Sequence, residues 1–232
     1  MMKYEELIEV LEYGSQTLMS KDGLTKVVIQ NDECYENPRE WSEYDAVMFC
    51  RHSRYKLGDK ELPCAGDLED WHNEEQDLEE DDDHEDFDLM YAVQKYVAGE
   101  LDCPFDHVVM LPLYLYDHSG LSMNTSGFAC SWDSGMVGVI AVDVRKYDDK
   151  NQAEESMKSQ VKEYDCYLRG EIYMGIVYRG EECNLGHTHW EEIDACTGFI
   201  GYDHGESGLA EWIYGDYVFG SNNMGGELEK AS

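Results

Sequence analysis

The sequence predicts an α+β fold with a mainly antiparallel sheet and a few packed helices. Short apolar segments of strand length follow one another along the chain with brief turns between them. Only a few segments show helical spacing. Apolar residues make up 42% of the chain and aromatic residues make up 12% of it, which is enough for a packed core. Strands that are neighbours in sequence and joined by short turns favour antiparallel pairing, and the few helices are expected to pack on one face of the sheet.

The first expected element is a short helix at the N-terminus, followed by strands. Tyr4, Leu7 and Leu11 recur at helical spacing, and Gly14 can end the helix. Residues rich in β-branched and aromatic side chains then predict the strands. These cover residues 25–30, 46–52, 108–116, 121–126, 137–142, 172–178 and 195–202. Since proline cannot donate to a sheet ladder, Pro112 is expected at an edge or a bulge.

Three further helices are expected, and the longest covers residues 151–168. Asn151 and Glu154 have the spacing of a capping box at its start, and Gly170 stops it. Another helix begins near Asp88 and ends by Gly99. A short last helix ends at Gly215. Since the chain has no internal repeat and no Pro/Ser-rich linker, we expect one globular domain over residues 1–232. It carries an acidic insertion at 67–88 and a flexible, Gly/Asn-rich tail at 221–232.

The dominant chemical feature is negative charge. The formal net charge is -34, and the 67–88 segment holds fourteen acids without a lysine or arginine. Such a field repels nucleic acid, anionic membranes and acidic substrates, and it attracts basic surfaces that bind nucleic acid. The expected partner-binding residues are therefore the acids of this segment. They are Asp67, Glu69, Asp70, Glu74, Glu75, Asp77, Glu79, Glu80, Asp81, Asp82, Asp83, Glu85, Asp86 and Asp88. The alternatives are a solubilising loop and an adaptation to high salt.

The remaining composition indicates a cytoplasmic protein. No apolar run reaches the roughly 20 residues of a spanning helix, and the N-terminus lacks the order of a signal peptide. The eight cysteines include no C-x-x-C pair, so we expect reduced thiols throughout. No membrane partner, no direct nucleic-acid partner and no cofactor are expected, and no feature of the sequence sets the oligomeric state.

Two polar segments are the candidates for catalysis. Asp117, His118 and Ser119 are consecutive, but neighbouring side chains diverge and cannot align as a triad. The second segment contains Asp133 and Ser134. We expect both segments to be turns in which the aspartates accept backbone hydrogen bonds. Trp132 of the second segment is expected to pack into the body. Asp117, His118 and Asp133 stay weak catalytic candidates.

Two other clusters invite a ligand. His187 and His189 lie on one face of an extended segment, and these two are weak metal candidates because no third ligand has a recognisable spacing. The basic residues Arg51, Arg54 and Lys56 follow a strand. They match phosphate or carboxylate ligands, but pairing with internal carboxylates is the favoured interpretation in so acidic a chain.

A series of short motifs resembles an uncharacterised protein family that is common in bacteriophages and mobile elements. The motifs are PREW at 38–41, RHSRYKLGD at 51–59, YDHSG at 116–120, WDSG at 132–135 followed by VG at 137–138, and EYDCYLRG at 163–170. The resemblance covers residues 25 to 205 and carries no reaction or catalytic residue. The acidic segment looks like an elaboration of the pattern. A phage setting implies host take-over or counter-defence.

These observations lead to one main hypothesis about function. We expect a phage-type interaction protein that binds and inhibits a nucleic-acid-binding host defence protein, such as a CRISPR effector or a restriction nuclease, by imitating nucleic acid. The first alternative is a metal-assisted hydrolase that uses the loops of Asp117/His118 and Asp133/Ser134. The second is a structural or virion-associated protein in which the acidity serves solubility only.

Overall fold

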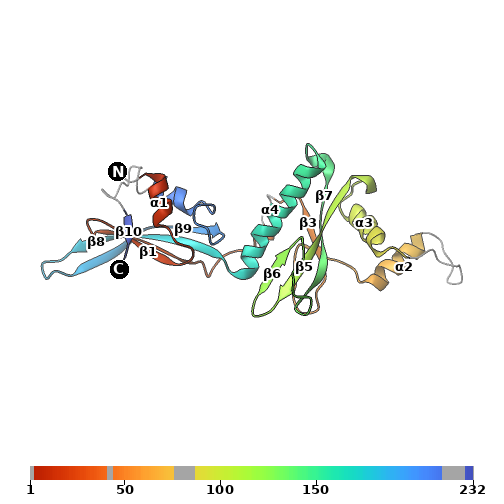
Figure 1. The fold of residues 1–232 in the computed structure, drawn as a ribbon, viewed down its shortest axis with the longest axis horizontal. Helices are drawn as coiled ribbons and strands as arrows, with labels where there is room; N and C mark the ends of the chain where they lie inside the picture. Colours follow the sequence, from red (N-terminus) through yellow and green to blue (C-terminus); the bar gives the residue numbers. More distant parts are fainter. Residues whose placement is uncertain (1–2, 41–43, 76–86, 216–227, 232) are drawn as a thin grey trace. The chain divides into compact units, whose positions relative to one another are not determined.

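The chain forms two compact units, whereas a single domain is expected from the sequence (Figure 1). The computed structural model describes residues 3–40, 44–75, 87–215 and 228–231. The terminal unit contains residues 1–36 and 169–232, and the central unit contains residues 37–168. The two ends of the chain therefore build one unit together, and the central unit is inserted between them in the sequence. Within the described residues, five helices and ten strands in two mostly antiparallel sheets confirm the α+β class.

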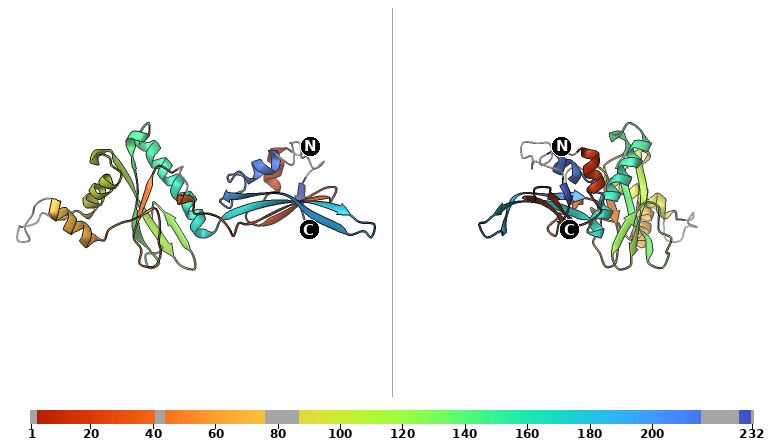
Figure 2. Two further views of the ribbon diagram at one scale, coloured as in Figure 1. Left: turned by 180° about the vertical axis from the view of Figure 1, so that it is seen from behind. Right: turned by 60° about the vertical axis from the view of Figure 1, so that its left-hand side comes forward.

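The terminal unit is a five-stranded sheet in the order β10-β1-β2-β8-β9. All of its strand pairs are antiparallel. The strands are β1 (Gln16–Ser20), β2 (Thr25–Asn31), β8 (Ile172–Glu182), β9 (Thr188–Ile200) and β10 (Leu228–Lys230). Two helices, α1 (Tyr4–Val10) and α5 (Leu209–Trp212), cover one face of this sheet (Figure 2). Their apolar side chains form a core with Leu18, Val27, Ile29, Val177 and Phe199.

The end of the chain belongs to this sheet, so the expectation of a flexible tail at 221–232 is wrong for residues 228–230. Leu228 pairs with Ser20 of β1 and is buried in the core of the terminal unit. That single buried leucine fixes the register of β10, because a shift by one residue would move it to the other face of the sheet. Residues 221–227 and 232 of the expected tail lie outside the described residues.

The central unit is a second five-stranded sheet, in the order β4-β3-β7-β5-β6, with helices on both faces (Figure 2). Its strands are β3 (Val47–Cys50), β4 (Lys60–Glu61), β5 (Val108–Asp117), β6 (Leu121–Asn124) and β7 (Ser134–Asp143). The helices are α2 (Ala65–Glu75), α3 (Leu89–Glu100) and α4 (Lys150–Arg169), with short 3-10 turns at Pro38–Glu40, Phe105–His107 and Val144–Lys146. Only the β3–β4 pair is parallel among the described strands.

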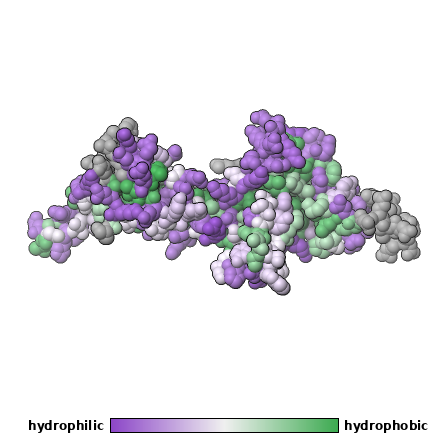
Figure 3. Space-filling model, viewed as in Figure 1, coloured by the Kyte–Doolittle hydropathy of each residue, from purple (hydrophilic) through white to green (hydrophobic). Residues whose placement is uncertain are grey.

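Alternation along β7 places one apolar core on each face of this sheet. Ile140 and Val142 face α4, where they meet Met157 and Val161. Val139 and Ala141 face α3 and α2, where they meet residues such as Val93, Val97 and Leu68. The period-2 pattern of a strand thus explains why an almost continuous apolar run is buried on both sides. The outward face of α4 is hydrophilic (Figure 3).

Local signals set the helix starts and the hairpin of the central unit. Asp88 caps α3, since its side chain accepts hydrogen bonds from the N–H groups of Met90 and Tyr91. The capping box expected at Asn151 is wrong, because α4 begins one residue earlier and Asp149 accepts from the N–H of Gln152 at 2.9 Å. The turn at His118–Gly120 joins β5 to β6 as expected.

Pro112 lies where proline can be tolerated. It sits on the part of β5 that β6 does not reach, since that pairing begins at Tyr114. A register shift follows directly, between Leu113 and Tyr114. Both facts agree with the expected position at an edge or a bulge.

A buried arginine holds together several segments of the central unit on the α4 side of its sheet. The side chain of Arg39 is 2% exposed. Its guanidinium donates to both carboxylate oxygens of Asp59, to Oε1 of Gln160 on α4 at 3.1 Å, and to the carbonyl of Ala46 at 2.7 Å. Asp59 also accepts from the N–H of Met48 in β3 at 2.7 Å. One side chain therefore joins the 38–40 turn, the 57–59 loop, β3 and α4.

Gly58 also holds the 57–59 loop against β3 and α4. Its φ of +63° lies in the left-handed region, and a Cβ there would lie 2.8 Å from Cβ of Met48. The N–H of Gly58 donates to the hydroxyl of Tyr164 at 3.1 Å. Burial raises the pKa of Tyr164 to about 12, so this hydroxyl stays neutral in ordinary conditions.

No helix within the described residues is long and apolar enough to cross a membrane.

Replacing Arg39 by lysine should strongly destabilise the central unit. Lysine keeps the charge but cannot reach Asp59, Gln160 and Ala46 together, so the free energy of unfolding should fall by about 2 to 3 kcal/mol. Hydrogen exchange at the amides of Val139 and Ile140 reports the opening of this sheet. The matched control is Arg145→Lys, because the side chain of Arg145 is half-exposed and pairs with Asp143. Equal effects of the two substitutions would contradict the prediction.

Cysteine reactivity should differ sharply between the two units. Burial raises the pKa of Cys50 to about 12, whereas N–H groups of Leu185 and His187 lower the pKa of the Cys183 thiol. Because the thiolate is the reactive form, iodoacetamide at pH 7.5 should alkylate Cys183 first and leave Cys50 unmodified in the native protein. Peptide mass spectrometry over time measures both rates. The difference should disappear in denaturant, and equal native rates would refute it.

Candidate functional site

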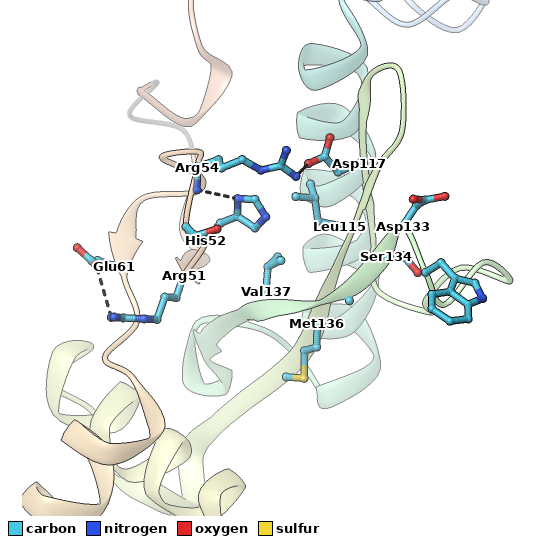
Figure 4. Close-up of a pocket in the computed structure, with 13 residues that line it drawn as sticks. Arg51, His52, Arg54, Glu61, Leu115, Asp117, Asp133, Ser134, Met136 and Val137 are labelled. Carbon is cyan, nitrogen blue, oxygen red and sulfur yellow. Dashed lines mark hydrogen bonds and ion pairs between the residues drawn. The ribbon is translucent and has the colours of Figure 1, made fainter.

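The central unit carries a cavity of about 550 Å³ where β3, β5 and β7 come together (Figure 4). Three of the sequence motifs supply most of its lining. The lining residues are Arg51, His52, Ser53, Arg54, Glu61, Leu115, Asp117, Trp132, Asp133, Ser134, Gly135, Met136 and Val137. Segments far apart in the sequence thus place polar side chains around one opening.

The cavity forms because β3 ends opposite Gly138, so that the first residues of β7 have no β3 partner beside them. The two strands pair as far as Cys50 and Gly138, and the N–H of Arg51 still donates to the carbonyl of Val137 at 2.7 Å. Gly138 is required at this point, since a Cβ there would lie 1.9 Å from the carbonyl oxygen of Phe49. Beyond it, β7 pairs only with β5 within the described part of the chain.

Apolar side chains form the floor of the cavity. Leu115 is 2% exposed, and Val137 is also buried. Both belong to the core on the α4 side of the sheet. The polar groups around this floor come from the segment after β3, from β4, from the end of β5 and from the turn into β7.

The two arginines of the cavity are each paired with a carboxylate. Arg54 forms an ion pair and hydrogen bond with Asp117, which also accepts from the hydroxyl of Tyr55 at 3.4 Å. Arg51 lies 3.4 Å from Glu61, with both side chains exposed to solvent. The internal pairing favoured for the basic segment is what the structure shows for these two residues.

His52 presents its other ring nitrogen to the cavity. Its Nδ1 accepts the N–H of Arg54 at 3.3 Å, and its ring stacks on Tyr55 at 5.0 Å between centroids. A neutral histidine with an accepting Nδ1 carries its proton on Nε2. The ring is therefore a hydrogen-bond donor toward the opening, as its direction in Figure 4 shows.

Asp133 differs from Asp117 in its partners. Its carboxylate lies 3.5 Å from Nδ1 of His118 and 3.5 Å from Sγ of Cys130. The N–H of Asp117 donates to its backbone carbonyl at 2.8 Å. Among the residues that the structure describes, no lysine or arginine side chain pairs with Asp133. The expected role of both aspartates, accepting backbone N–H groups in their turns, is not what their carboxylates do.

Trp132 is the largest departure from the sequence-based expectation. It is 95% exposed, so the expectation that it packs into the body is wrong. The preceding segment turns back through a hydrogen bond from Oγ of Ser134 to the carbonyl of Cys130 at 2.5 Å. Trp132 lies within this short turn, and its exposed indole lines the cavity.

The catalytic and metal candidates come together only in part. Asp117, Asp133 and Ser134 line the cavity, and His118 adjoins it through Asp133. They do not form a triad, because Asp117 pairs with Arg54 and the hydroxyl of Ser134 is used by the backbone. His187 and His189 belong to the terminal unit. Within the described residues, no three histidine, cysteine or acidic side chains are grouped to hold a metal ion.

The acidic candidates are distributed over a helix, an undescribed stretch and a cap. Asp67, Glu69, Asp70 and Glu74 are exposed on α2, which is anchored by the buried Leu68. Glu75 ends that helix and Asp88 caps α3. The others lie outside the described residues: Asp77, Glu79, Glu80, Asp81, Asp82, Asp83, Glu85 and Asp86.

Sequence reasoning named Arg51 and Arg54 without placing them beside Asp117, and it did not single out Glu61 or Met136. The signal that could have joined them is the order of the motifs, since the RHSRY, YDHSG and WDSG segments all reach the same opening. Comparison with protein-family models, curated proteins and solved structures found no match to this chain.

Truncating Trp132 should leave the central unit as stable as before. Because its side chain is 95% exposed, Trp132→Ala should change the free energy of unfolding by less than about 0.5 kcal/mol. Leu115→Ala, on the floor of the same cavity, should cost about 2 to 5 kcal/mol. Hydrogen exchange at Val139 and Ile140 compares the two. A large loss in Trp132→Ala would mean that the indole stabilises the fold.

Proposed function

We propose that this chain is an acidic interaction protein that binds a basic, nucleic-acid-binding protein and blocks its nucleic-acid site. The observation that carries the proposal is the excess of acid in both units. The central unit has 31 acids against 11 bases, and the terminal unit has 20 against 6. Since neither unit is neutral, the whole chain presents a field of one sign to a partner.

Helix α2 supports the imitation of nucleic acid. Its four exposed acids, from Asp67 to Glu74, extend over about 10 Å of helix at ~1.5 Å per residue. Duplex DNA carries about six charges over the same length, at one charge per ~1.7 Å of axis. The charge density of the helix is thus within a factor of about two of the DNA, and the acids that follow it in sequence add to the field.

The motif series supports a particular setting for this partner. It resembles a protein family that is common in bacteriophages and mobile elements, and a phage setting implies host take-over or counter-defence. We therefore propose a CRISPR effector or a restriction nuclease as the partner, counter-defence as the role, and the host cytoplasm as the location. Association should be fast at low salt and weaken as salt rises, because opposite fields steer the encounter.

A hydrolase is the second candidate, and the cavity is what favours it. Two carboxylates, a serine hydroxyl and the ring of His118 lie around one opening with an apolar floor. The proposal ranks second because the hydrogen bonds of Asp117 and Ser134 do not connect to His118. Hydrolysis of a panel of ester and phosphoester substrates that is lost in Asp133→Asn would reverse the order.

Neutralising the acids of α2 should weaken capture of the partner. The test variant carries Glu69→Gln, Asp70→Asn and Glu74→Gln, and the matched control carries Glu181→Gln, Glu191→Gln and Glu192→Gln on β8 and β9 of the terminal unit. Both remove three exposed negative charges. Affinity for a partner recovered from host lysate at low salt should fall about tenfold in the test variant and by less than about threefold in the control.

The salt dependence of binding gives a second readout. Each variant is titrated between low and high salt, and the slope should become shallower in the α2 variant than in the control. A further variant replaces residues 79 to 83 by their amides and should behave like the α2 variant. If all variants bind as the unaltered chain does at low salt, the acidic segment only solubilises the protein.

A further inference from the structure

We propose that Trp132 and Asp133 form a subsite that captures an arginine or lysine side chain from an extended segment of the basic partner. This inference deepens the proposed function by naming the chemistry that the partner must present at one place, and it rests on that function only for the identity of the partner. Trp132 would cover the cationic group with its indole face, and Asp133 would pair with its charge.

The charge balance of the cavity selects a cation. Its lining contains two arginines and three carboxylates, so its formal charge is -1 with His52 neutral. Both arginines already pair with carboxylates, namely Asp117 and Glu61. The carboxylate left over is Asp133. A site for phosphate or a carboxylate ligand would need the opposite excess, so the basic segment in the sequence does not create an anion site here.

Asp133 and Trp132 are suited to act together because they are adjacent and free of competing strong partners. Within the described part of the chain, Asp133 meets only His118 and the thiol of Cys130, neither of which carries a fixed charge. Trp132 is 95% exposed beside it. A cation over an indole face gains electrostatic attraction from the ring, and a neighbouring carboxylate adds an ion pair.

The strand next to this pair offers a place for the backbone of the ligand. One edge of β7 pairs with β5, and β3 covers the other edge only from Gly138 onward. On that second edge, Ser134, Gly135 and Met136 have no paired strand among the described residues. An extended peptide can add to such an edge through main-chain hydrogen bonds. Gly135 has no heavy atom within 4 Å of its Cβ position, so the face of the sheet at this residue has room for a side chain of the added segment. The side chain of the added residue could then reach Trp132 and Asp133.

Proton NMR of the full chain labelled with ¹⁵N tests the subsite directly. The probe is acetyl-Gly-Arg-Gly-amide, and its matched control contains citrulline, which has nearly the shape of arginine without the charge. The indole N–H signal of Trp132 is identified by its loss in Trp132→Ala. The arginine probe should shift this signal and the amide of Gly135 in a saturable manner, and the citrulline probe should not.

Variants separate the subsite from the general field. Asp133→Asn and Trp132→Ala should each weaken binding of the arginine probe about threefold to fivefold, followed at the amide of Gly135. Asp106→Asn removes the same charge from an 80% exposed position elsewhere in the central unit and should change binding by less than about twofold. Equal weakening by Asp133→Asn and Asp106→Asn, or a stronger response to inorganic phosphate than to the arginine probe, would overturn the proposal.

The experiment also distinguishes failure of the subsite from failure of the proposed function. If the arginine probe binds at Trp132 but no basic protein is captured from host lysate, the subsite stands and the proposed inhibitor function falls. If a basic protein is captured equally well by the unaltered chain and by Trp132→Ala and Asp133→Asn, and the probe does not bind, the subsite falls while the function stands.

Discussion

The central unit depends on one buried guanidinium. Placing the charge of Arg39 away from water is costly unless its N–H groups find partners, and here Asp59, Gln160 and the carbonyl of Ala46 supply them. The ring of Tyr44 adds a cation–π contact at 4.5 Å. Since these partners come from separate segments, the arginine can be satisfied only when those segments have their native arrangement. This requirement specifies the position of the 57–59 loop as well as stabilising it.

The position of that loop determines the geometry of the candidate site. Between Cys50 at the end of β3 and Asp59 in the buried network, the chain has only a few residues in which to leave the sheet and return to it. Arg51, His52 and Arg54 lie in this interval and line the cavity. The motifs that resemble the phage family thus divide into two groups. Arg39 of PREW, the LGD segment and Tyr164 of EYD contribute to the network that ties the 57–59 loop to α4, and residues of RHSRY, YDHSG and WDSG surround the opening.

Local sequence signals were enough for much of the fold and for part of the site. The apolar runs at β5, β7 and β8, the stripe of α4 and the cap at Asp88 each follow from periodicity or from hydrogen bonding within a few residues. The two-unit organisation could not be predicted, because Leu228 pairs with Ser20 of β1, which lies some two hundred residues earlier in the chain. The exposure of Trp132 could not be predicted either, because burial of an indole depends on which distant segments of the chain pack over it. Trp132 lies in a tight turn and is exposed.

The field of the central unit is negative because its acids outnumber its bases by 31 to 11. Among the residues that the structure describes, at least seven of the eleven bases of the central unit lie in ion pairs with carboxylates of the same unit. They are Arg39, Arg51, Arg54, Lys60, Arg145, Lys150 and Lys158. Each pair takes up one acid and one base, so it leaves the net charge unchanged but removes the base as a binding group for an anion. What a partner meets is therefore the remaining acid, concentrated on α2 and present at the cavity as Asp133. A broad field accelerates the encounter with any basic surface, but it selects poorly among basic surfaces. Selection requires a shaped position where a charge must fit, and the carboxylate of Asp133 beside an exposed indole and an open strand edge provides one.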